Sequence, residues 1–73
     1  MITSTITGKN YNPSECVYIS NPIQCAKYLK HIGTEFFMDI IFSSEKREDA
    51  LVFVWAKNDK TKECKLLWDQ HKL

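Results

Sequence analysis

The sequence is poor in the residues that interrupt regular structure, with two glycines and two prolines among 73 residues. It also carries little net charge, because ten lysines and arginines nearly balance nine aspartates and glutamates. The first scarcity, together with 44% hydrophobic residues, excludes a disordered chain. The second means that no global electrostatic field draws the protein to DNA or to an anionic membrane.

Long hydrophobic runs are absent as well, so no segment of the sequence reaches the length that spans a membrane. The first ten residues, MITSTITGKN, lack the basic start and the continuous apolar stretch of a signal peptide. We therefore expect a cytoplasmic protein without a membrane partner. The length of 73 residues corresponds to one small domain, in which an enclosed substrate pocket would occupy much of the core.

The cysteines are too few and too widely spaced for a disulfide framework, since they lie at Cys16, Cys25 and Cys64. With His31 and His71 they make five soft ligands, but no pair has the C-x-x-C or H-x-x-x-H spacing of a metal site. The sequence therefore predicts reduced thiols, no metal and no cofactor.

The middle of the chain contains a strand that runs directly into a helix. Residues 16–20, CVYIS, are β-branched and aromatic and predict the strand. Asn21 is a suitable helix cap, Pro22 suits the first helical position, and Gly33 is a typical terminator. We therefore expect a helix over residues 22–32.

Two further strands and a second helix follow. Residues 35–43 and 50–57 predict strands joined by the charged connection EKRED, and the last helix begins near Asn58 or Asp59 and runs to the end. The order β-α-β-β-α predicts an α+β domain with two helices on one face of a three- or four-stranded, mostly antiparallel sheet. The alternation in ITSTIT allows an extra edge strand within residues 1–15, which otherwise read as a loop.

One carboxylate lies among six apolar residues in the stretch FFMDIIF, residues 36–42. Alternation turns the even positions to the helices and the odd positions outward, so Asp39 is expected to mark the solvent side. The partner strand has two possible registers, which turn either Leu51, Phe53 and Trp55 or the smaller residues between them toward the helices. Burial of the larger side chains favours the first register.

The layout resembles small Firmicute and phage proteins that carry a domain of unknown function. The matching pieces are YISNPIQCAKYLKHIG, LVFVWAKND and KECKLLWDQH, which cover about residues 17–71. The resemblance implies an origin among phage or mobile-element accessory genes and no assigned activity.

A second resemblance concerns VYISNP, residues 17–22, which looks like the first short motif of an RNA recognition motif. It implies that Tyr18 stacks a base and that the second motif lies near ALVFVWA. The alternative function is therefore single-stranded nucleic-acid binding, in which the residues involved would be Tyr18, Phe53, Trp55, Lys27 and Lys30.

No nucleophile beside a base, phosphate-binding glycine loop or framed pair of carboxylates is recognisable in the sequence. We therefore predict a protein that is not an enzyme and has no small-molecule substrate. It would act as an accessory or inhibitor protein that occupies and blocks a surface of a host protein, or it would bind a second copy of itself. The predicted surface is formed by Phe37, Asp39 and Ile41. There Asp39 would pair with an arginine or lysine of the target while its apolar neighbours exclude water.

Overall fold

The protein was analysed as a computed structural model, which describes residues 1–43 and 50–73. The predicted connection EKRED, residues 45–49, lies outside the described residues. In chain order the elements are β1 (Ile2–Thr3), β2 (Asn10–Tyr11), the 3₁₀ turn η1 (Pro13–Glu15), β3 (Cys16–Ile19), α1 (Pro22–Ile32), β4 (Phe37–Ser43), β5 (Ala50–Ala56) and α2 (Asp59–Asp69).

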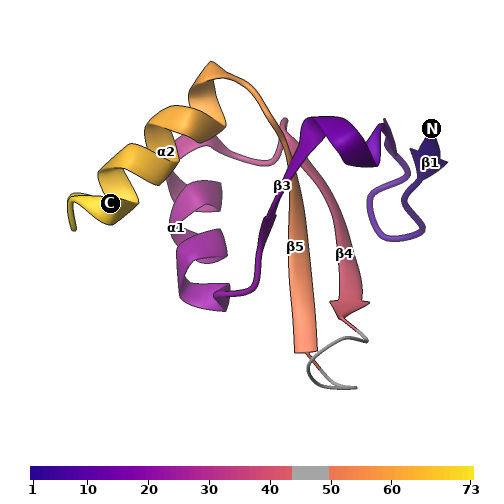
Figure 1. The fold of residues 1–73 in the computed structure, drawn as a ribbon, viewed down its shortest axis with the longest axis horizontal. Coiled ribbons are helices and arrows are strands. Elements are labelled where there is room, and N and C mark those ends of the chain that lie inside the picture. Colours follow the sequence, from indigo (N-terminus) through magenta and orange to yellow (C-terminus); the bar gives the residue numbers. More distant parts are fainter. Residues whose placement is uncertain (44–49) are drawn as a thin grey trace.

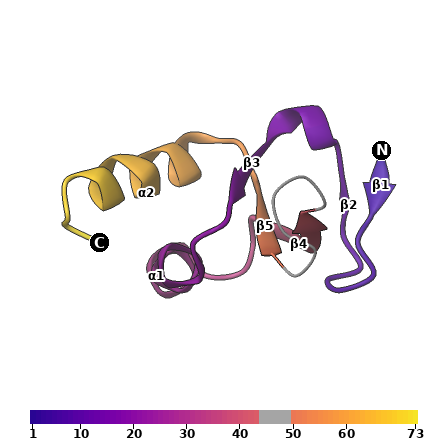
Figure 2. The same cartoon turned by 60° about the horizontal axis from the view of Figure 1, so that its bottom comes forward.

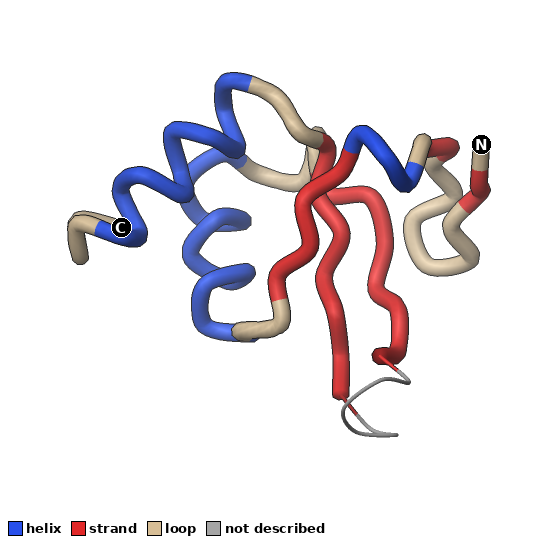
Figure 3. The backbone as a smooth tube through the Cα atoms, in the orientation of Figure 1, coloured by secondary structure: helices blue, strands red, loops and turns tan. Residues whose placement is uncertain are grey.

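The strands form two antiparallel sheets, one of three strands in the order β3-β5-β4 and one of two strands, β1-β2. The helices lie on one side of the larger sheet and the N-terminal segment lies on the other, so the two termini are at opposite ends of the molecule (Figures 1 and 2). The tube view shows the same division, with the three longer strands between the helices and the N-terminal loop (Figure 3). The predicted α+β class is confirmed.

Both helices begin at an asparagine that accepts hydrogen bonds from the first free backbone N–H groups. Asn21 accepts from the N–H groups of Ile23 and Gln24, and Asn58 forms a capping box with Thr61. Helix α1 is followed by its cap Gly33, whose φ of 74° is a positive value that glycine tolerates best.

The prediction that the second helix continues to the C-terminus is wrong, because α2 ends at Asp69. The chain then turns at His71, which has a φ of 57°, and the backbone N–H of Lys72 donates to the carbonyl of Leu67. His71 is consequently exposed.

The core lies between the helices and the helix-facing side of the sheet. Trp55 is completely buried there and meets the ring of Tyr28 edge-on, with centroids 5.5 Å apart. Phe53 packs against the same cluster, whereas Val54 is buried on the opposite side of the sheet, where it pairs with Asp39. The register that turns the larger side chains toward the helices is therefore the one found.

A shift in register interrupts β4 between Phe37 and Asp39. Phe37 pairs with Trp55, whereas Asp39 pairs with Val54, the next residue of β5. Because neighbouring residues of a strand face opposite sides, Phe37 faces the helices and Asp39 faces away from them. Regular alternation had predicted that Phe37 and Asp39 lie on the same face, and this prediction is wrong because the register shifts between them.

The N-terminal segment lies against β4. Its turn is closed by bonds between the backbones of Ser4 and Lys9 and of Gly8 and Ser4, and Gly8 has a φ of 74°. The Thr7 hydroxyl donates to the carbonyl of Met38 at 2.6 Å, and the Lys9 ammonium donates to that of Phe37 at 3.0 Å. The extra strand predicted in this segment is β1, which pairs with β2 in a separate two-stranded sheet and not with the larger sheet.

Candidate functional site

Asp39 is buried, with an exposed fraction of 6%, although the sequence predicted that it faces solvent. Its carboxylate accepts hydrogen bonds from the Ser4 hydroxyl at 2.7 Å, the Tyr11 hydroxyl at 2.6 Å and the backbone N–H of Ile40 at 2.8 Å. The prediction was right that Asp39 points away from the helices and wrong that water lies there. The N-terminal segment covers that position.

The hydrogen bonds keep the Asp39 carboxylate ionised. Burial raises its pKa, but the bonds from Ser4, Tyr11 and Ile40 outweigh burial and hold the pKa below its ordinary value. The same contact raises the pKa of Tyr11 to about 12, because the phenol proton is held by the carboxylate and the ring is buried. The group attaches the N-terminal segment to the sheet, and both of its oxygens accept hydrogen bonds inside the protein.

The predicted protein-binding surface does not form as one exposed patch. Phe37 lies on the helix side, with its ring centroid 5.2 Å from that of Trp55. Asp39 is buried on the other side, and Ile41 is half-buried there. The physical reason is the register shift together with the cover supplied by the N-terminal segment.

The residues of the predicted nucleic-acid site are also separated. Tyr18 is 49% exposed and pairs with Val54, which places it on the face opposite Trp55 and Phe53. Trp55 is completely buried, so it offers no ring to a base. The expected row of stacking aromatics is therefore not present on either face of the described sheet.

The two lysines assigned to that alternative lie on α1. Lys27 donates to the carbonyl of Leu73 at 2.7 Å, and its ammonium lies 5.7 Å from the centre of the Trp68 ring. Lys30 is exposed. Lys27 thus ties the C-terminus to α1, and neither lysine lines the surface around Tyr18.

A different candidate site is a groove of about 590 Å³ between β3, the first half of α1 and the start of α2. Its volume is within the range of ligand sites in proteins. The groove is lined by Val17, Tyr18, Ile19, Ser20, Asn21, Gln24, Tyr28, Lys57, Asn58, Asp59, Thr61, Lys62 and Lys65.

Strand β3 presents its edge to this groove. Residues 17–21 all line it, whereas a strand that turned one face toward a groove would contribute every second residue. The N–H of Lys57 donates to the carbonyl of Glu15, so these two residues form a hydrogen-bonded pair. This pair determines which residues of β3 bond to β5. By antiparallel alternation Val17 and Ile19 bond to β5, and the backbone N–H and C=O of Tyr18 point away from it.

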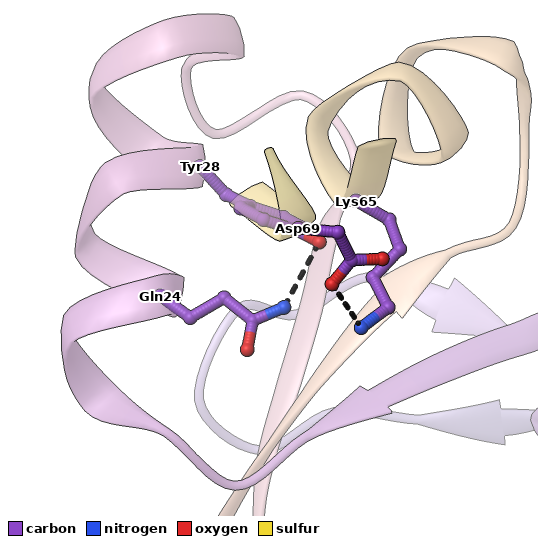
Figure 4. Close-up of polar contacts among 4 residues, drawn as sticks. All are labelled: Gln24, Tyr28, Lys65 and Asp69. Atoms are coloured by element: carbon purple, nitrogen blue, oxygen red, sulfur yellow. Dashed lines mark hydrogen bonds and ion pairs between the residues drawn. The ribbon is translucent and has the colours of Figure 1, made fainter. Parts of the chain in front are cut away.

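The inner wall of the groove is polar. Gln24 Nε2 donates to the Tyr28 hydroxyl at 3.1 Å, and both residues are buried. The amide oxygen of Gln24 points away from Tyr28, and the Lys65–Asp69 pair lies beside them (Figure 4). Since the Tyr28 oxygen accepts in this bond, its proton is free to be donated to a third group.

The sequence patterns had not singled out the groove. Asn21, the predicted cap of the first helix, and Asn58, one of the two residues predicted to begin the second, both line it. They mark the ends of the segments that enclose the groove, but periodicity within each segment contains no information about the space between segments.

The remaining chemistry is sparse in the described part of the chain. Cys16, Cys25 and Cys64 are free, and within residues 1–43 and 50–73 no three metal-binding side chains gather at one point. None of the helices in these same ranges is long and apolar enough to cross a membrane. In the comparisons with known proteins, no family model, curated protein or solved structure matches the chain.

Proposed function

We propose that the protein is a non-enzymatic binding module that captures an extended segment of a partner protein in the groove. The segment lies along the outer edge of β3 and extends the sheet by one strand. The observation that carries the proposal is the position of the groove, which follows the backbone of residues 17–21 edge-on. Binding of this kind occupies a surface of the partner, as the sequence led us to expect.

The backbone of β3 supplies the general part of the recognition. The N–H and C=O of Tyr18 point away from β5 and match the groups that an antiparallel or parallel strand offers. Each such hydrogen bond contributes about 0.5–1.5 kcal/mol net, so a strand of four residues gives modest affinity by itself. Side chains in the groove must therefore contribute to affinity and selectivity.

The structure of the other edge supports the assignment to β3. At β4 the N-terminal segment occupies backbone carbonyls, because Thr7 bonds to Met38 and Lys9 bonds to Phe37. Covering one edge in this way is a common protection against unwanted strand pairing. The outer edge of β3 is flanked by a groove, which is the arrangement that accommodates an added strand.

A proline at position 18 tests the backbone contact directly. Tyr18→Pro removes the N–H that points outward and leaves the bonds of Val17 and Ile19 to β5 in place, and prolines are tolerated on edge strands in this orientation. Tyr18→Ala is the matched control, because it removes the side chain and keeps the N–H. Both variants are first checked for a native circular dichroism spectrum.

The experiment selects binders for the wild-type protein from a library of random linear peptides displayed on yeast. We expect selected peptides to bind Tyr18→Ala and to lose about tenfold or more in affinity for Tyr18→Pro. By NMR, a bound peptide should slow amide exchange at Tyr18 more than at Ile19, which already bonds to β5. Failure to select any binder, or equal binding to the proline variant, would overturn the proposal.

A further inference from the structure

We infer that the groove selects acidic segments, in which aspartate or glutamate side chains are held by the lysines at the start of α2. This inference rests on the proposed function and adds the chemistry of the partner. The occupant is an extended stretch of a partner protein with carboxylates on the side that faces α2.

The charge of the lining carries the inference. Three lysines, Lys57, Lys62 and Lys65, line the groove against a single carboxylate, Asp59, although the chain as a whole is almost neutral. Lys65 pairs with Asp69 at 3.0 Å, whereas Lys57 and Lys62 form no ion pair with any residue in the described ranges. The groove therefore has two ammonium groups ready for carboxylates of a partner.

The inner wall agrees with this assignment. A segment that placed a large apolar side chain against Gln24 and Tyr28 would leave their amide oxygen and hydroxyl proton without partners, which is unfavourable. A carboxylate at this position would accept the Tyr28 proton, and the Lys65 side chain lines the same groove. Polar and acidic side chains are thus favoured at the wall as well as at the rim.

The same lysines would attract phosphates, so a nucleic acid is the competing occupant. A peptide is favoured because the edge of β3 offers alternating N–H and C=O groups, which a peptide strand complements and a nucleotide chain does not. Stacking of bases on these aromatic rings is also disfavoured, since Trp55 is buried and Phe53 lies on the helix side.

The test repeats the peptide selection with reversed charge. The variant Lys57→Glu/Lys62→Glu changes two lining residues, and Lys30→Glu/Lys72→Glu is a control with the same net charge whose positions do not line the groove. Peptides are sequenced before and after selection on each protein, and a mixed-sequence single-stranded oligonucleotide is titrated in parallel at low salt.

We expect aspartate and glutamate to be enriched about threefold or more in peptides selected on the wild type and on the control. The groove variant should enrich lysine and arginine instead. Binding of an acidic peptide to the wild type should weaken about fivefold or more between low and high salt.

Other results separate the two proposals. Peptides that depend on the Tyr18 backbone but show no acidic enrichment would overturn the charge selection and leave strand addition standing. If no peptide is selected, both proposals fail. An oligonucleotide that binds more tightly than the acidic peptides and loses binding in the groove variant would overturn the assignment of a peptide partner.

Discussion

The Tyr11 hydroxyl donates a hydrogen bond of 2.6 Å to Asp39 Oδ2 and so joins the N-terminal segment to the edge strand β4. With the Ser4 bond to the other oxygen, it fixes that segment over the face opposite the helices. The sheet is therefore covered around Asp39 as well as on its helix side. The groove proposed to bind a partner lies at the opposite edge of the sheet, beside β3.

We expect Tyr11→Phe to lower the free energy of unfolding by about 1–3 kcal/mol, because it leaves a buried carboxylate with one donor fewer. Tyr18→Phe is the matched control, since it removes an exposed hydroxyl that bonds to the Pro13 carbonyl, and its effect should be within about 0.5 kcal/mol. Urea denaturation measures both. Equal effects of the two substitutions would contradict the special role of the buried bond.

Asp39→Ala should destabilise the protein by at least about 2 kcal/mol, because it leaves the hydroxyls of Ser4 and Tyr11 buried without their acceptor. A double-mutant cycle with Tyr11→Phe should show strong coupling, since each substitution removes the same bond. Peptide binding in the groove should persist in the folded fraction. A variant with wild-type stability would show that the carboxylate is dispensable for attaching the N-terminal segment.

The Asp39 carboxylate should also make stability fall in acid. Its pKa lies below the ordinary value of 3.8, so on acidification the unfolded chain takes up this proton before the folded one. Its contribution is complete above the ordinary carboxylate range and is lost as the pH falls from about 4 through the folded pKa. Thermal melting against pH measures the slope, which should be shallower in Asp39→Asn than in wild type.

Tyr11 acts in the opposite direction at alkaline pH. Its pKa is raised to about 12 from 10.0, so the unfolded chain loses the phenol proton first and stability falls as the pH rises through this interval. Tyr11→Phe should remove this part of the alkaline slope. An unchanged slope in melting between pH 9 and about 11 would indicate that other groups cause it.

Local patterns predicted the helices and the main strands well because the signals for them are local. The asparagine caps, the glycine at the end of α1 and the β-branched stretches each act within a few residues. The helix over residues 22–32 matches α1, and Phe53 and Trp55 of β5 face the core because burial of the larger side chains favours that register.

The burial of Asp39 could not be predicted from alternation. It depends on contacts with Tyr11 and Ser4, which lie 28 and 35 positions away from it along the chain. In the sequence alone, a polar residue such as Ser4 resembles a loop residue, because its contact with the Asp39 carboxylate forms only in the folded protein. The groove was not predicted for a related reason. It lies between segments, and the pattern of each segment was already explained by its own helix or strand.

The start of α2 should influence both stability and binding, because the cap holds the segment that places Lys57 and Lys62. The Asn58 side chain accepts from the N–H groups of Lys60 and Thr61, and the Thr61 hydroxyl donates to the Ala56 carbonyl. Asn58→Ala should lower the free energy of unfolding by about 1 kcal/mol, whereas Asn58→Ser should retain most of it.

Acidic peptides test the link from this cap to the groove. We expect their affinity to fall in Asn58→Ala and to remain near the wild-type value in Asn58→Ser, with both measured well below the melting temperatures. The reason is that the alanine releases the first turn of α2, so the lysines lose their fixed positions beside β3. If the alanine variant is less stable but binds equally well, the lysines attract the peptide through charge alone and need no fixed geometry.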